Sequence, residues 1–161
     1  MYIERKLSDS LTIYKNLRFC KREQKSSHRY RVTIGIGGNV GDVRRRFSHL
    51  EVYLMRDKRV EFLQRSLILK NPPFGFINQD DFFNSIIILK TSMQPMLFLD
   101  YLMRVEKKFG RKRSFANAPR TLDLDIIFFD DRVVKKERLS IPHPEHFKRE
   151  SVLIPLKGLK R

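Results

Sequence analysis

The sequence predicts an α+β fold, and two observations lead to that class. Segments that alternate apolar and polar residues, as strands do, are separated by two segments whose apolar residues recur every three to four positions, as in helices. Glycine and proline residues mark most of the boundaries between them. The order strand, helix, strand, strand, helix, strand predicts a ferredoxin-like βαββαβ core, with a mostly antiparallel sheet and helices on one face.

The first half of this core begins with Val32–Ile36, which alternates and is rich in β-branched residues, as strands are. Gly37–Asn39 is expected to end that strand. The segment Val43–Asp57 follows and places its apolar residues on one helical face. We predict a second strand over Val60–Lys70.

Two adjacent prolines end the second strand, because proline lacks the N–H group that a strand ladder needs. Phe83–Thr91 is predicted to be the third strand, and Pro95–Phe109 the second helix, with proline at its start and glycine after its end. Leu122–Phe129 is the fourth strand. The proline-punctuated segment Leu139–Leu156 is expected to wrap over the sheet.

Residues 1–30 differ from the rest of the chain. Their basic side chains follow no helical or strand period, so we interpret them as a basic N-terminal extension with a short strand around Leu11–Tyr14. The compact domain is expected to span residues 31–161.

Composition excludes several classes of protein. The 161 residues include 34 Lys and Arg against 18 Asp and Glu, a net charge of +16, with 41% hydrophobic residues. This is neither a disordered nor a membrane-embedded composition, and no apolar run reaches the roughly 18–20 residues of a membrane-spanning helix. The single cysteine, Cys20, excludes an internal disulfide and a cysteine-based zinc site, so we expect a cytoplasmic protein without a membrane partner.

Two aspartates stand on the fourth predicted strand. Alternate side chains of a strand share a face, so Asp123 and Asp125 point the same way. The neighbouring Leu122, Leu124 and Ile126 then face the core. Two carboxylates so close together repel each other, which a divalent cation such as Mg²⁺ relieves. Taken alone, so short a pattern is more often an ordinary solvent-facing strand edge.

Three arginines accompany the aspartate pair. Arg111 and Arg113 lie just upstream, and Arg120 follows Pro119 three residues before Asp123. A cation beside planar guanidinium groups is what a transferring phosphoryl group requires. A helix C-terminus that carries basic residues explains Arg111 and Arg113, but it does not explain Arg120.

Two further motifs are less specific. Gly35–Asp42 is similar to a nucleotide loop, but Val40 stands where a dinucleotide fingerprint needs glycine, so we interpret it as a strand-to-helix turn capped by Asn39 or Asp42. After the second strand, residues 71–75 and 81–84 supply aromatic rings near one sheet edge, which suits a slot for a flat heterocycle. Asn84 would supply paired donor and acceptor groups there. Core packing explains each phenylalanine there equally well.

Four segments together resemble the 6-hydroxymethyl-7,8-dihydropterin pyrophosphokinase family: Gly35–Asp42, Asn71–Asn84, Glu106–Phe128 and Leu139–Leu156. The most specific is Pro-Arg-Thr-Leu-Asp-Leu-Asp-Ile, which begins at Pro119. The resemblance covers about residues 32–156, so the compact domain would be a pterin pyrophosphokinase domain.

The resemblance implies transfer of the β,γ-diphosphate of ATP to the hydroxymethyl group of the pterin, with release of AMP, in folate biosynthesis. It implies that Asp123 and Asp125 hold two Mg²⁺ ions, and that Arg111 and Arg120 act on the transferring group. The implied pterin contacts are Asn71, Pro72, Pro73, Phe74, Gly75, Phe82 and Asn84. The implied ATP contacts are Glu106, Arg113, Ile126, Arg138, Ser140, His143 and Arg149. ATP, as co-substrate, and the pterin are then the partners of an enzyme that we expect to be monomeric.

Two departures from the family pattern concern the loops. Asn117 and Ala118 stand where the family commonly has Trp-Gly, and Ser151 stands where some members place a second aromatic against the pterin. Neither affects the aspartates or arginines above, so we expect an active enzyme.

The alternative from a different class is a basic RNA-binding module, since RNA-recognition motifs share the ferredoxin-like order. Such modules stack bases on aromatic residues of the central strands. The corresponding segments here, Val32–Ile36 and Ile86–Leu89, are aliphatic. We therefore do not expect nucleic acid as the partner.

Overall fold

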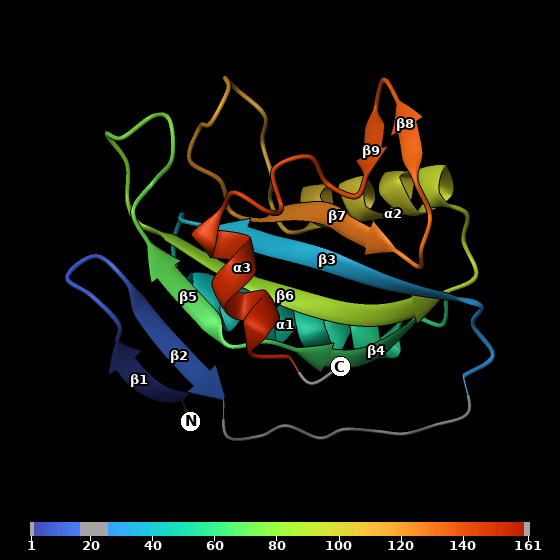
Figure 1. The fold of residues 1–161 in the computed structure, drawn as a ribbon, viewed down its shortest axis with the longest axis horizontal. Coiled ribbons are helices and arrows are strands. Elements are labelled where there is room, and N and C mark those ends of the chain that lie inside the picture. Colours follow the sequence, from blue (N-terminus) through green and yellow to red (C-terminus); the bar gives the residue numbers. More distant parts are fainter. Residues whose placement is uncertain (1, 17–25, 160–161) are drawn as a thin grey trace.

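A computed structural model describes residues 2–16 and 26–159 (Figure 1). Cys20 and part of the N-terminal extension lie outside the described residues. The described part is a mixed α/β structure with three helices, α1 (Val43–Arg56), α2 (Pro95–Lys108) and α3 (Glu150–Lys157). Its strands are β1 (Tyr2–Lys6), β2 (Thr12–Asn16), β3 (Tyr30–Gly38), β4 (Val60–Arg65), β5 (Ile68–Asn71), β6 (Phe82–Thr91), β7 (Asp123–Phe129), β8 (Val134–Lys136) and β9 (Leu139–Ile141).

The main sheet has the order β1-β2-β5-β6-β3-β7, and β4 also pairs with β6. Every neighbouring pair in this sheet is antiparallel. The predicted mostly antiparallel sheet is thus confirmed. β8 and β9 form a separate two-stranded sheet.

The two faces of the sheet differ in their cover. α1 packs against β4 and α2 against β7, and this face holds the apolar core. α3 packs against β5 and β6, and Figure 1 shows it in front of the sheet while α1 lies behind. Of the segment expected to wrap over the sheet, α3 therefore covers the second face, whereas Leu139 and Ile141 of β9 belong to the core cluster.

The predicted single strand over Val60–Lys70 is wrong, because the segment forms β4 and β5 with a break at Ser66. The Ser66 N–H donates to the Ile86 carbonyl at 2.8 Å, and its Oγ accepts from the Ile86 N–H at 2.9 Å. Ser66 Oγ also lies 3.0 Å from Ser85 Oγ. A serine hydroxyl here takes the place of a ladder carbonyl, which shifts the pairing from β4 to β5.

The expected break at Gly37–Asn39 comes later than predicted. Gly37 and Gly38 still pair with Asn84 and Phe83 of β6, so β3 ends only at Gly38. Asp42 then caps α1, since its Oδ1 accepts the Arg45 N–H at 3.0 Å.

Two strands of the N-terminal extension join the sheet. β1 pairs with β2, and β2 pairs with β5 over residues 12–14. Tyr14 is buried in the core cluster. The division of the chain at residue 31 stays a prediction, and the structure adds that the extension is in contact with the domain.

None of the helices among residues 2–16 and 26–159 is both long and apolar enough to cross a membrane.

Candidate active site

The two aspartates of β7 lie on the face opposite the core. Asp123 pairs with Gly37 of β3 and Asp125 with Gly35, while Leu124 and Ile126 between and after them are buried in the core. The alternation read from the sequence is therefore present in the structure. It leaves both carboxylates free to face a ligand.

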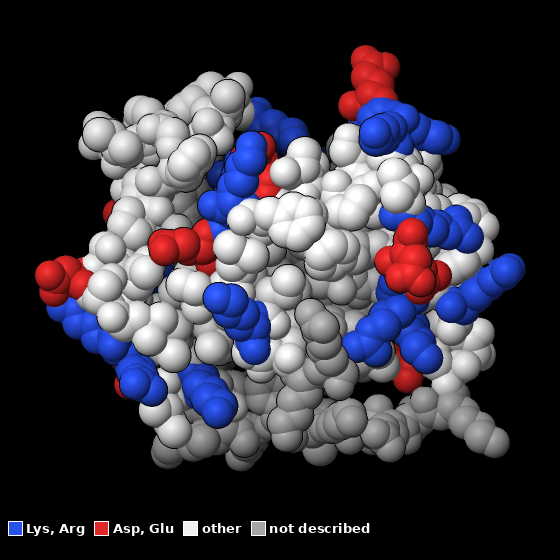
Figure 2. Space-filling model, in the orientation of Figure 1, with Lys and Arg blue, Asp and Glu red and all other residues white. Residues whose placement is uncertain are grey.

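A pocket of about 590 Å³ opens on this face. Asp123 and Asp125 form part of its wall, together with Gly35, Gly37, Asn84 and other residues from several elements. The remaining lining residues are Ser10, Leu11, Ile36, Asn71, Pro72, Phe74, Phe82, Ser85, Asn117, Arg120, Ile127, His143, Lys148, Arg149, Glu150, Ser151 and Val152. Figure 2 shows this side of the molecule, with basic and acidic side chains next to one another in the hollow.

The floor of the pocket includes two glycines that the sequence analysis took as structural. Gly37 lies between Asn84 and Asp123 across the sheet, and Gly35 pairs with Asp125. A Cβ at Gly37 would come 2.7 Å from Asn84 Oδ1. Glycine at two alternate positions of β3, on the face of the aspartates, is the signal that indicates this role.

Two arginines approach Asp123. Arg111 Nη2 lies 3.7 Å from its Oδ1, and Arg120 Nη1 lies 3.4 Å from its Oδ2. Burial lowers the pKa of Arg111, against the opposing effect of Asp123. The structure thus brings together the four residues assigned to catalysis, of which Arg111 contacts Asp123 but does not itself line the pocket.

Asp125 is the most perturbed group of the pocket. Burial, followed by the like charges of Asp123 and Glu106, raises the pKa of its carboxyl to about 7. Its side chain is nevertheless open to the pocket. When water fills the pocket, burial contributes less to the raised pKa, and the repulsion from Asp123 and Glu106 is the cause that remains.

Several guanidinium nitrogens at the pocket have no hydrogen-bond partner. Among the described residues, they are Nε and Nη1 of Arg111, Nε of Arg120 and Nε of Arg149, all buried. Buried donors without partners are rare in folded proteins. These donors fit an anionic ligand such as a phosphate chain.

The residues assigned to the pterin lie at the other side of the pocket. Asn84 Nδ2 donates to Asn71 Oδ1 at 2.7 Å, and Pro72 lines the wall beside them. Phe82 is buried below the Arg120 guanidinium, whose Cζ is 4.9 Å from the ring centroid. Phe74 is 73% exposed, and the Arg149 Cζ lies 5.4 Å from its ring centroid. Pro73 and Gly75 do not line the pocket.

The residues assigned to ATP contact do not all lie at the pocket. His143 and Arg149 line the pocket, and burial, followed by the Arg149 charge, lowers the pKa of His143. The other five do not line it. Glu106 and Ile126 are buried, Arg113 pairs with Glu106 at 3.1 Å, Arg138 pairs with Asp100 at 2.7 Å, and Ser140 is exposed on β9.

Glu106 has a structural role that the sequence did not indicate. Its Oε1 accepts the Leu124 N–H at 2.8 Å, between the two aspartates of β7. Burial raises the pKa of this carboxyl, and the hydrogen bond from Leu124 opposes that rise. Glu106 thereby fixes the strand on which both aspartates stand.

Asn39 holds the two loops that border the pocket. Its Nδ2 donates to Gln79 Oε1 at 2.9 Å, and its Oδ1 accepts the Arg120 N–H at 2.9 Å. Gln79 Nε2 in turn donates to the Asn117 carbonyl at 3.0 Å. The sequence analysis named Asn39 only as a candidate helix cap, because its contacts lie 40 and 81 residues away along the chain.

The fold and the site together define a class of protein. A pocket that sets two carboxylates among arginines with unpaired donors is suited to binding and transferring phosphate groups. The comparisons with known proteins identify the family. The model of the 7,8-dihydro-6-hydroxymethylpterin-pyrophosphokinase family matches residues 33–161. The chain therefore belongs to that family.

Relatives from several bacteria support the assignment. The chain is 40% identical over 130 residues to a protein of Campylobacter jejuni, covering 81% of this chain and 83% of the relative. It is 39% identical over 128 residues to a protein of Helicobacter pylori, covering 78% of each chain. A protein of Aquifex aeolicus is 37% identical over 128 residues, which is 78% of this chain and 77% of the relative.

All three relatives are named 2-amino-4-hydroxy-6-hydroxymethyldihydropteridine pyrophosphokinase. The resemblance inferred from the sequence is confirmed. The RNA-binding alternative receives no support from these comparisons.

Proposed function

We propose that this chain transfers the β,γ-diphosphate of ATP to the hydroxymethyl group of 6-hydroxymethyl-7,8-dihydropterin and releases AMP, as a step in folate biosynthesis. The observation that carries the proposal is that Asp123, Asp125 and Arg120 line one pocket of a pyrophosphokinase family member, with Arg111 next to Asp123.

In the proposed reaction, the hydroxymethyl oxygen forms a bond to the β-phosphorus. The bond between that phosphorus and the oxygen bridging to the α-phosphorus breaks, and this oxygen leaves with AMP. The hydroxyl proton passes to solvent. Such a transfer depends mainly on in-line positioning and on stabilising charge. The unpaired guanidinium donors of Arg111 and Arg120 would supply that charge stabilisation.

The residues present fit Mg²⁺. Burial, followed by the like charges of Asp123 and Glu106, raises the pKa of Asp125, and a cation held by Asp123 and Asp125 would relieve the repulsion between them. Water and phosphate oxygens, which Mg²⁺ commonly keeps as ligands beside one or two carboxylates, would complete its coordination. When bound, Mg²⁺ neutralises charge on the phosphate chain. That two ions bind is part of the proposal.

The finer assignments have support of different kinds. The order β7-β3-β6 with β4 and β5 beyond it supports a ferredoxin-like core. The Asn71–Asn84 hydrogen bond and the Phe82 ring support a pterin subsite at the β5 side of the pocket. The ATP contacts, a monomeric state and a cytoplasmic location stay predictions.

The test is AMP release from ATP with 6-hydroxymethyl-7,8-dihydropterin, with and without Mg²⁺. We expect AMP only when both are present, and we expect Asp123→Asn to lower the rate about 10³-fold or more. Asp131→Asn is the matched control, since Asp131 is exposed just beyond the same strand, and its rate should equal wild type. ADP as the product, or no pterin-dependent turnover by wild type, would overturn the proposal.

A further inference from the structure

The hairpin formed by β1 and β2 lies outside the residues that the family model matches, which begin at residue 33. It nevertheless reaches the pocket. Ser10 and Leu11, in the turn between the two strands, are part of the pocket wall. Figure 1 shows this turn beside the end of β5 from which the next loop begins.

The strand register explains why the turn reaches the pocket. Thr12 pairs with Lys70, so Leu11, one residue nearer the turn, comes level with Asn71. Asn71 is the last residue of β5 and accepts the hydrogen bond from Asn84. The turn itself is closed by the Leu7 N–H, which donates to the Leu11 carbonyl at 2.8 Å.

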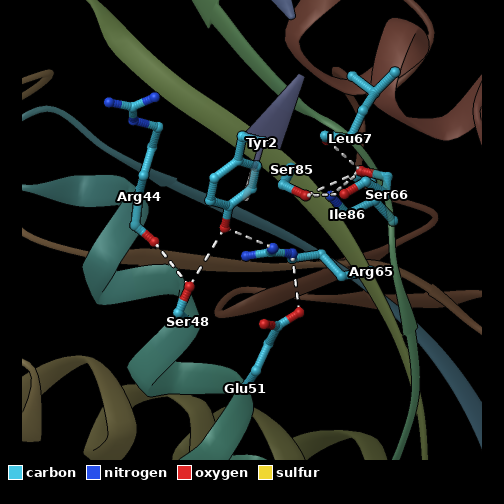
Figure 3. A network of polar contacts seen from close by, with 9 residues as sticks. All are labelled: Tyr2, Arg44, Ser48, Glu51, Arg65, Ser66, Leu67, Ser85 and Ile86. Atoms are coloured by element: carbon cyan, nitrogen blue, oxygen red, sulfur yellow. Dashed lines mark hydrogen bonds and ion pairs between the residues drawn. The ribbon is translucent and has the colours of Figure 1, made fainter. Parts of the chain in front are cut away.

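Side chains on both strands hold the hairpin in place. From β2, Tyr14 is buried, and the Arg44 Cζ lies 4.6 Å from its ring centroid. From β1, the Tyr2 hydroxyl lies 3.3 Å from Ser48 Oγ of α1 and accepts from Arg65 Nη2 at 3.0 Å (Figure 3). The hairpin is therefore fastened to α1 and to β4 as well as to β5.

The position across the sheet separates the turn from the aspartates. β2 and β7 are four inter-strand spacings apart in the order of the sheet, which places them roughly 19 Å from each other. The turn thus lies on the Asn71 side of the pocket rather than beside Asp123 and Asp125.

We propose that Leu11 is a substrate-positioning residue of this chain, supplying an apolar wall against the ring of the heterocyclic substrate. The inference rests on the proposed function and on its pterin subsite. Ser10 borders the same wall. Leu7 belongs to the same turn but is 45% exposed and does not line the pocket.

The test compares Leu11→Ala with Leu7→Ala, which removes the same atoms from the same turn. We expect Leu11→Ala to raise the KM for the pterin roughly 5-fold, because part of an apolar contact is lost. The KM for ATP and kcat should stay within about 2-fold. Leu7→Ala should leave all three constants at wild-type values, and Leu11→Met should restore most of the pterin KM.

Two results would overturn this inference. One is a pterin KM for Leu11→Ala equal to that of Leu7→Ala, and the other is an equal rise of both substrate KM values, which indicates a general loss of structure. Either result with an active wild-type enzyme leaves the proposed function standing. Wild-type enzyme that releases no pterin-dependent AMP overturns the proposed function first.

Discussion

Two of the clusters in which arginine contacts carboxylate among the described residues differ in how their charge is enclosed. The hairpin cluster consists of Tyr2, Ser48, Glu51 and Arg65, and the Arg65 side chain is only 2% exposed. The pocket cluster consists of Arg111, Arg120, Asp123 and Asp125, and the Asp123 side chain is 25% exposed.

The balance of charge also differs. In the hairpin cluster, Arg65 Nε lies 3.0 Å from Glu51 Oε1, and Arg65 Nη2 donates to the Tyr2 hydroxyl at 3.0 Å. In the pocket cluster, Arg111 and Arg120 both approach Asp123, and buried donors without hydrogen-bond partners occur on the arginines of both clusters. The clusters therefore differ in exposure: the hairpin pair is enclosed, which suits a structural role, whereas Asp123 and Asp125 line an open pocket, where a ligand can reach them.

Of the effects that test this comparison, the largest is expected in the hairpin cluster. Arg65→Met removes the cation and leaves the Glu51 carboxylate partly buried without a partner, which should lower the free energy of unfolding by about 3 kcal/mol. Chemical denaturation measures this, and kcat at saturating substrate should stay near wild type. The double variant Arg65→Met with Glu51→Gln should recover part of the loss. A double variant less stable than Arg65→Met would contradict the explanation by unpaired charge.

The next effect tests the pocket cluster. Arg120→Ala should lower kcat about 100-fold, because it removes one preorganised donor to the transferring group, while the free energy of unfolding changes little. Steady-state kinetics with each substrate varied measures the split between kcat and KM. Arg120→Lys keeps the charge without the planar fork and should recover only part of kcat. An effect confined to the KM for ATP would contradict the assignment to the transition state.

The smallest effect is on the pH dependence of stability. The pKa of Asp125 in the folded chain, about 7, lies above its ordinary value of 3.8, so between these values the folded chain holds a proton that the unfolded chain has released. Stability from this group is full below the ordinary value and is lost as the pH rises through about 7.

Asp125→Asn should therefore gain Tm over wild type at pH 8, where the wild-type carboxyl is ionised, and almost none at pH 4, where it is protonated in the folded chain. The gain at pH 8 should be only a few degrees, since solvent in the pocket screens the repulsion. Thermal unfolding at both pH values measures this. Mg²⁺ should raise the Tm of wild type at pH 8 and not that of the variant. An equal gain at the two pH values would exclude like-charge repulsion as the cause.

The parts of the site that follow from local sequence were predictable. Asp123 and Asp125 share a face because a strand alternates, and the core position of Leu124 follows from the same rule. The break at Ser66 was not predictable, because it depends on a hydroxyl that meets Ile86 of another strand. The hairpin contact with β5 was missed for the same reason, since strand pairing between residues 12 and 70 has no local signal.

The pairing of β2 with β5 has a practical consequence for anyone who shortens this chain to the part that the family model matches. A form that begins near residue 31 would leave the N–H and C=O groups of Ile68–Lys70 unpaired along that side of β5. An uncovered strand edge is a template for pairing with another copy of the chain. Such a truncated protein would be prone to aggregate, and its low yield would then say nothing about whether the enzyme works.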